Sequence, residues 1–171
     1  MSTDLALLIL RLVTGLTIAA HGSQKLFGWF GGGGWAGSLK MAQGLRLRPV
    51  PFWALMSGLA EFGGGVLLAL GLLSPIGSLG VMAAMLMAII TAHWPRFFNS
   101  NRGMEFPLLI LTSALTVGIS GPGAYSLDAL IGLALPEPVS LLVGIGLVVA
   151  GIVLALATRQ PAAVQSAPQQ E

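Results

Sequence analysis

The side chains best suited to chemistry in this sequence are His21, Gln24, Lys25, His93 and Glu105. The first three stand at the end of the first apolar segment, His93 ends the third, and Glu105 begins the fourth. A histidine exchanges protons near neutral pH, and the amide and ammonium groups donate hydrogen bonds to a carbonyl or an anion. We therefore predict a ligand site at headgroup depth, where the helix ends converge. The alternative is that these residues only cap and anchor helices, with Lys25 reaching out to lipid phosphate.

Two further ionisable residues, Arg11 and Glu61, lie inside apolar segments. At 1.5 Å per helical residue, Glu61 is roughly 14 Å in from Phe52, and Arg11 is roughly 15 Å from His21. A lone charge in hydrocarbon costs at least about 3 kcal/mol, so each should face the bundle and find a partner. We predict contact between Arg11 and Glu61, directly or through water. The pair would either fix the helix register or form a proton or ligand site near the membrane midplane.

The sequence offers little for a metal or a covalently held cofactor. It has no cysteine, which excludes thiolate nucleophiles, disulfide relays and cysteine-ligated iron–sulfur clusters in this chain. Its two histidines lack a metal-ligand spacing, so we predict no metal site and give haem held by both histidines a low rank. The glycine run 31–34 lacks the Gly-Lys-Ser/Thr ending of a phosphate-binding loop, so no nucleotide role is assigned.

Composition identifies the class of protein. Hydrophobic residues make up 55% of the 171 residues and charged residues only 8%, against about 25% charged in soluble domains. The formal net charge of +2 gives no reason to expect nucleic-acid binding. This composition predicts an all-α membrane protein. Each span needs about 20 apolar residues, so the length allows four or five spans. The predicted spans are 5–20 (or on to 27), 52–73, 76–92, 106–119 and 139–157.

Between the spans, residues 37–43 are predicted to form a short interfacial helix, and 129–135 are too few to cross a bilayer. We divide the chain into a bundle (1–135), an additional C-terminal span (136–157) and a disordered tail (158–171). Lysines and arginines fall in the loops after the first and third spans, whereas Asp4, Asp128 and Glu137 fall on the other side. The positive-inside rule then predicts a multi-pass protein with its N-terminus outside.

Residues 21–28, with the sequence HGSQKLFG, resemble the DoxX family of small bacterial membrane proteins. The resemblance includes Arg11 before this motif, Glu61 in 58–61, His93 with 101–106, and residues 121–128, and it covers roughly 5–130. It implies a four-helix transmembrane core in the bacterial inner (plasma) membrane. It also implies a link to thiosulfate:quinone oxidoreductase subunits and to membrane oxidoreductase assemblies that act under oxidative stress. The fifth, C-terminal span is a departure from that pattern.

Three functions are compatible with these features, and whether the chain is itself an enzyme is left open. The first is a redox-linked membrane subunit that binds a quinone or docks a soluble or membrane oxidoreductase. The second is a non-catalytic scaffold or assembly factor whose basic loop, 40–48, recruits a partner or anionic lipid. Small-solute or proton transport ranks last, because the sequence shows no inverted repeat and no clear pair of discontinuous helices.

Overall fold

The computed structural model describes residues 2–160, and every regular element within them is a helix. Four helices are long and apolar enough to cross a membrane: α1 (Ser2–Leu26), α3 (Val50–Leu70), α4 (Ile76–Ala88, continued by the π-helical turn Ile89–His93) and α7 (Val139–Ala157). A fifth apolar helix, α5 (Glu105–Ser120), is shorter. The remaining elements are the short helices α2 (Gly34–Gly44), α6 (Leu127–Ile131), Trp29–Gly31 and Asn99–Asn101. The prediction of an all-α membrane bundle is confirmed.

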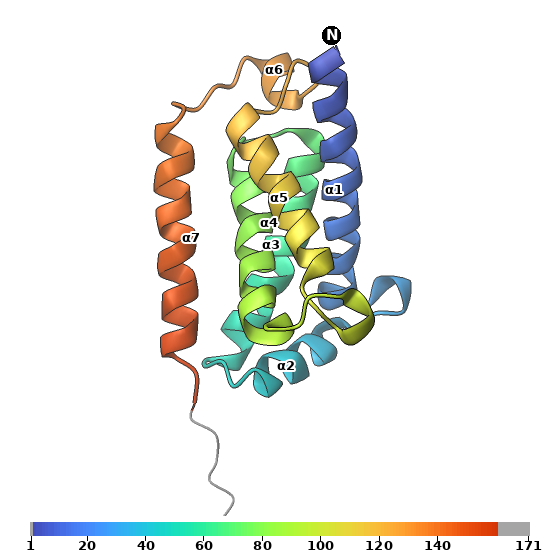
Figure 1. Cartoon of the computed structure of the whole chain (residues 1–171), viewed down its shortest axis with the longest axis vertical. Helices are drawn as coiled ribbons and strands as arrows, with labels where there is room; N and C mark the ends of the chain where they lie inside the picture. The colour runs from blue at the N-terminus through green and yellow to red at the C-terminus, as the bar shows by residue number, and fades with distance from the viewer. Residues whose placement is uncertain (1, 161–171) are drawn as a thin grey trace, which may run out of the picture.

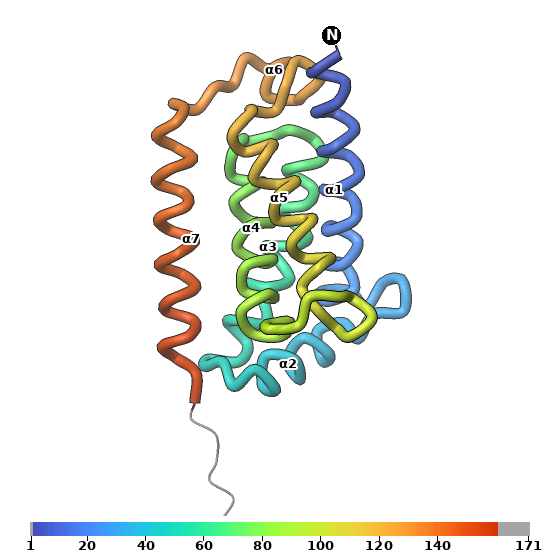
Figure 2. The backbone as a smooth tube through the Cα atoms, in the orientation of Figure 1, coloured from blue at the N-terminus to red at the C-terminus, as the bar shows by residue number. Residues whose placement is uncertain are grey.

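Helices α1, α3, α4 and α5 form the bundle (Figure 1). Each packs on the next in the order α1, α3, α4, α5, and α5 closes the ring against α1. Helix α7 stands beside this bundle and packs mainly on α4. The tube in Figure 2 shows α6 closing the end at which the chain begins and α2 lying across the opposite end. Below, these are called the α6 end and the α2 end.

Glycines bring α1 and α3 into backbone contact. A Cβ atom on Gly15 would lie 2.6 Å from the Ala69 nitrogen, and one on Gly22 would lie 2.2 Å from the Phe62 nitrogen. Real Cβ atoms essentially never approach backbone this closely, so both sites require glycine. Small residues at helix interfaces permit such contact in membranes, where van der Waals packing drives association. These two contacts fix the register of the antiparallel pair.

The core lies between the four bundle helices. Its buried members come from all of them: Ile18, Leu68, Val81, Met82, Ala84, Met85, Ile110, Ala114 and Val117. Met82 and Met85 are therefore packing residues. Large apolar side chains on the outside, such as Ile9, Leu109 and Leu147, are more than half exposed and form the lipid-facing surface.

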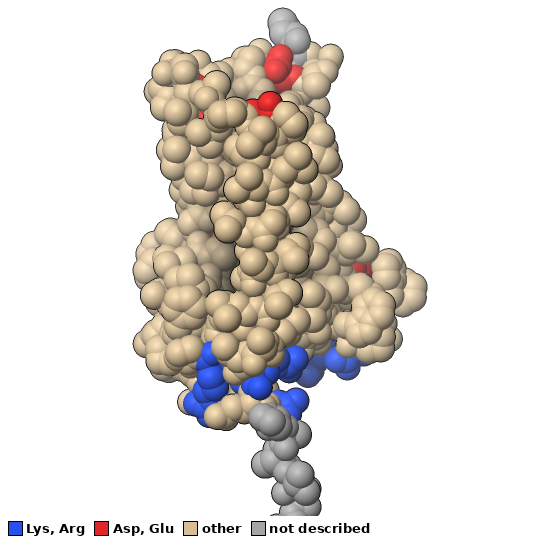
Figure 3. Space-filling model, turned by 90° about the vertical axis from the view of Figure 1, so that its left-hand side faces the viewer, with Lys and Arg blue, Asp and Glu red and all other residues tan. Residues whose placement is uncertain are grey.

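Charge is segregated between the two ends. In the view onto α7, lysines and arginines gather around the α2 end, and acidic residues lie at the α6 end (Figure 3). Between them the surface shown is almost free of charge, as hydrocarbon requires. The cations at the α2 end come from α2, the α2–α3 loop, the α4–α5 loop and the end of α7: Lys40, Arg46, Arg48, Arg96, Arg102 and Arg159.

Most helix boundaries lie within a few residues of the predictions. Helix α7 covers 139–157 as predicted, and α2 includes the predicted interfacial helix 37–43. Helix α1 ends only at Leu26, six residues beyond the shorter predicted end at residue 20. Of the predicted disordered tail 158–171, residues 158–160 are described and 161–171 lie outside the described residues. The division into three units remains a prediction.

We expect Gly22→Ala to lower the free energy of unfolding by about 1–3 kcal/mol, because the alanine methyl group would overlap the backbone of α3. Gly63→Ala is the matched control, since a Cβ atom there meets nothing within 4 Å. It should be neutral or stabilising by up to about 1 kcal/mol through helix propensity. Unfolding in mixed detergent micelles measures both changes. Equal effects of the two variants would contradict the close α1–α3 packing.

Candidate functional site

A pocket of about 400 Å³ opens at the α2 end, between the last turns of α1 and the segment that follows them. One wall carries His21, Gln24 and Lys25, and the other is formed by Gly31–Gly34, Gly37, Ser38 and Met41. Its volume falls within the range of about 300–1,000 Å³ typical of small-molecule sites. The structure thus brings three of the predicted site residues together around one space.

The α1 wall follows from helical spacing. Residues 21, 24 and 25 are related by three and four positions, so their side chains share one helix face. The His21 ring also lies 5.5 Å from the Phe106 ring, which packs it against the start of α5. Gln24 Nε2 lies 3.4 Å from the carbonyl oxygen of Phe30, at the long limit of a hydrogen bond. One face therefore presents an imidazole, an amide and an ammonium group to the pocket.

The opposite wall is backbone with few side chains. Gly32 must lack a side chain, because a Cβ atom there would lie 2.5 Å from Gln24 Cβ. Gly31 and Gly37 have no such neighbour within 4 Å, so a ligand could approach the main chain there. The Ser38 hydroxyl donates a 2.8 Å hydrogen bond to the Lys25 carbonyl, which holds α2 against the end of α1. The glycine run thus shapes the pocket.

Lys25 connects this pocket to a buried carboxylate. Its Nζ lies 2.5 Å from Glu61 Oε1 and 2.9 Å from the Ser57 hydroxyl oxygen. The Glu61 side chain is 6% exposed and that of Lys25 is 25% exposed, so the ammonium bridges the interior and the opening. An ammonium has three donors, and these two contacts leave one for a ligand. Within residues 2–160 the second oxygen, Glu61 Oε2, is buried without a hydrogen-bond partner.

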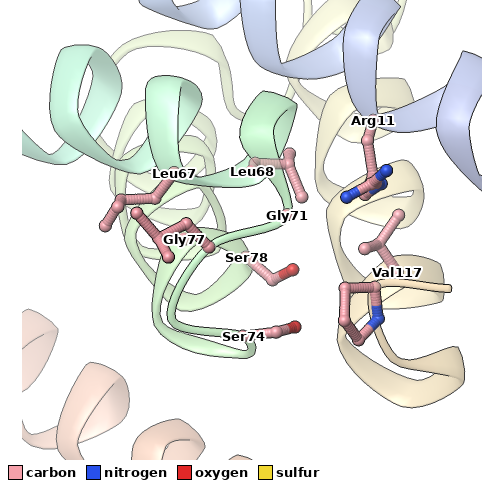
Figure 4. A pocket seen from close by; sticks show the side chains of 10 residues that line it. Arg11, Leu67, Leu68, Gly71, Ser74, Gly77, Ser78 and Val117 are labelled. Atoms are coloured by element: carbon pink, nitrogen blue, oxygen red, sulfur yellow. The ribbon is translucent and has the colours of Figure 1, made fainter. Parts of the chain in front are cut away.

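The predicted contact between Arg11 and Glu61 is wrong. Arg11 is fully buried at the α6 end, where its Nη2 donates a 2.6 Å hydrogen bond to the Tyr125 carbonyl. A Cβ atom on Gly71 would overlap Arg11 Nη1, so the glycine that ends α3 makes room for the guanidinium. Figure 4 shows Arg11 reaching from α1 toward this turn, with Ser78 and Val117 around the same small cavity.

Asp128 attracts the Arg11 guanidinium electrostatically. The Asp128 carboxylate is itself buried and accepts hydrogen bonds from the backbone nitrogens of Leu73 and Ser74, at 2.9 and 2.8 Å. These bonds fasten α6 to the α3–α4 turn. Arg11 therefore belongs to the closure of the α6 end and not to the pocket.

The error arose from the register of α1 and α3. Gly15 of α1 lies level with Ala69 of α3, and Gly22 lies level with Phe62. Because the helices are antiparallel, Arg11, four residues before Gly15, is level with residue 73, four residues after Ala69. Since α1 runs on to Leu26, Arg11 is roughly 22 Å from that end, while Glu61 is roughly 16 Å from the start of α3. Lys25, at the far end of α1, is the cation within reach of Glu61.

His93 and Glu105 do not line the pocket. His93 Nδ1 lies 2.8 Å from the Arg102 carbonyl, and Glu105 Oε2 accepts a 2.9 Å hydrogen bond from the Asn99 nitrogen. Both side chains thus hold the loop between α4 and α5. Of the five residues predicted to converge, the structure places three around the pocket and holds the other two against the α4–α5 loop.

Sequence reasoning missed Ser57, Ser38 and the pocket role of the glycine run. A serine four residues before Glu61 on the same helix was an available signal, because that spacing shares a face. The glycine run 31–34 matches no nucleotide motif, and its role as a pocket wall depends on how it folds against α1. Within residues 2–160 no group of three or more His, Asp or Glu side chains could hold a metal ion. The expectations about metal, haem and quinone remain predictions.

We expect Lys25→Met to lower the free energy of unfolding by about 3 kcal/mol, because it leaves the Glu61 carboxylate buried without its counter-ion. Glu61→Met should cost less, since the released ammonium can reach water through the pocket. The double variant should recover part of the loss. A double-mutant cycle by unfolding in micelles measures the coupling. Simply additive losses would show that the ion pair does not stabilise the fold.

Comparison with known proteins places these residues in a family. The DoxX family model matches residues 6–94, which contain most of α1, all of α3 and α4, and the pocket residues. A Bacillus subtilis (strain 168) protein named "Putative oxidoreductase CatD" is 30% identical over 129 residues, covering 74% of this chain and 87% of that protein. No solved structure matches. The family match covers more than half of the chain, and the chain belongs to the DoxX family.

Proposed function

We propose that this protein is a redox-linked membrane subunit that binds a quinone headgroup in the pocket at the α2 end. The observation that carries the proposal is the shared face of His21, Gln24 and Lys25, which aims donors into a space of about 400 Å³. A quinone ring offers two carbonyl acceptors and is otherwise flat and apolar. A few placed donors in a pocket at the membrane boundary match that chemistry.

The surroundings of the pocket support a lipid-soluble ligand. Phe27, Trp29 and Trp35 are each at least 40% exposed, and the Phe27 and Trp29 ring centres are 5.0 Å apart. Exposed aromatic rings of this kind are favoured where the bilayer meets water. A quinone carrying an isoprenoid tail could enter the pocket from the lipid and leave its tail there. The pocket lies at the α2 end, which in a bilayer would be at the level of the lipid headgroups.

The roles of the donors follow from their contacts. The third N–H of Lys25 would donate to one quinone carbonyl while Glu61 keeps the ammonium in place. His21, which is exposed, would exchange a proton with solvent as the quinone is reduced and takes up two protons. The chain has no cysteine, so the electrons would come from a partner oxidoreductase docked at the α2 end. The name of the Bacillus subtilis relative supports a redox link at this coarse level.

A scaffold or assembly factor is the second candidate. It is favoured by the structural use of Arg11 and Glu61, each of which has a stabilising partner in the fold. On this alternative the pocket would be filled by lipid, and the α2 end would only recruit a partner. Quinone binding distinguishes the two, because a scaffold has no reason to bind a headgroup with saturable affinity.

The test is titration of the purified protein in mild detergent with a decyl-substituted benzoquinone, followed by quenching of tryptophan fluorescence. Trp29 and Trp35 lie in the elements that form the pocket, so binding should quench them. We expect His21→Ala and Gln24→Ala each to raise Kd about tenfold, equivalent to about 1.4 kcal/mol. His93→Ala is the control, since it lies outside the pocket wall, and its Kd should stay that of the wild type. Absence of saturable quenching, or an equal loss in the control, would favour the scaffold.

We further propose that the protein resides in the bacterial inner (plasma) membrane with the α2 end in the cytoplasm and the N-terminus outside. The gathering of cations at the α2 end supports this orientation. In this topology α5 makes a crossing, so that α7 is the fifth span. The cysteine-free chain permits a direct test with single cysteines. In whole cells a membrane-impermeant thiol reagent should label Ser2→Cys but not Ser100→Cys, and the opposite pattern would reverse the topology.

A further inference from the structure

A group of arginines lies where the end of α7 meets the loop between α2 and α3. Arg159 Nε donates a 3.0 Å hydrogen bond to the Leu45 carbonyl, and the Gln160 nitrogen donates one of 3.0 Å to the Arg46 carbonyl. These bonds bring Arg159 beside the loop that carries Arg46 and Arg48. We call these three residues the arginine patch. Figure 3 shows lysine and arginine side chains gathered around the foot of α7.

No carboxylate neutralises this patch within residues 2–160, where the salt bridge that forms is between Lys25 and Glu61. Arg46 and Arg48 are exposed on either side of the buried Leu47. Arg159 uses Nε for a carbonyl, which leaves both of its terminal nitrogens as donors. Three always-charged guanidinium groups are thus carried by adjoining segments, and residues 2–160 supply no carboxylate that pairs with them.

The surface above the patch is apolar. On α7 the side chains of Leu147, Val149, Val153 and Leu154 are each more than half exposed. In the view onto α7, the surface above the cations is almost free of charge, and a hollow lies beside the helix (Figure 3). A ligand that satisfies both regions carries a phosphate at one end and hydrocarbon at the other. Free phosphate is a poorer match than such a ligand, because it would leave the apolar surface of α7 without a contact.

We propose that the arginine patch is a binding site for the headgroup of an anionic glycerophospholipid, with its acyl chains against α7. Guanidinium groups bind phosphate oxygens in pairs, and basic groups between helices at a membrane boundary are suited to acidic lipid headgroups. The lipid would neutralise the patch and fill the side of α7 that faces away from α4. This proposal is independent of the quinone pocket, which lies on other residues.

The test is native mass spectrometry of the detergent-purified full chain, titrated with phosphatidylglycerol or with phosphatidylethanolamine. We expect the wild type to bind the anionic lipid at least fivefold more tightly than the zwitterionic lipid. The double variant Arg46→Gln/Arg159→Gln should lose at least fivefold in affinity for phosphatidylglycerol. Arg159→Lys keeps the charge but not the guanidinium fork, so its affinity should fall between these limits.

The matched control is Arg96→Gln/Arg102→Gln, which removes the same charge from the same end of the molecule. It should retain wild-type affinity, because those arginines lie in the α4–α5 loop. An equal loss in both double variants would show only general attraction to cations and would overturn the site. Equal binding of the two lipids by the wild type would also overturn it. Thermal unfolding without added lipid checks that each variant is folded, and if the double variant unfolds, Arg159→Lys alone decides.

Discussion

The backbone contact between α1 and α3 is the constraint on which the rest of the structure depends. Membrane helices gain nothing from burying apolar surface against one another, so close packing must supply the attraction. Gly15 and Gly22 let the two helices touch and allow one register. That register decides which polar groups on the two helices can meet. It sends Arg11 to the turn after α3 and brings Lys25 beside Glu61.

Both buried charges then find a partner of opposite charge, but at opposite ends of the bundle. Arg11 is matched by Asp128 and a carbonyl, all within the fold, and is committed to structure. Glu61 is matched by Lys25, whose ammonium is partly open to a pocket. The same physical demand thus produces a closed cluster at one end and an accessible one at the other. The accessible cluster is the one that a ligand can reach from the pocket.

Hydropathy predicted the spans well because it records a property of each segment by itself. Helix α7, which is apolar throughout, was predicted to the residue, and residues 21, 24 and 25, grouped as candidates, line one pocket. The failures concern relations between segments. Residues 21–26 are polar enough to resemble a loop yet continue α1, and this shifted the estimated depth of Arg11. The partner of Glu61 depended on a register that only the glycine contacts determine. His93 and Glu105 were placed at the correct end, but local hydrogen bonds turn them into their own loop.

The additional helix α7 also determines at which end of the bundle the backbone lies after the last helix. A chain that stopped after α6 would finish at the end opposite to the pocket. By running the full length of the bundle, α7 returns the backbone to the α2 end, where residues 159 and 160 are fastened to the α2–α3 loop. A domain fused directly after residue 160 would therefore be tethered on the pocket's own side. Short linkers give local concentrations in the millimolar range, so even a weak affinity of such a domain for the α2 end would suffice for occupancy near the pocket.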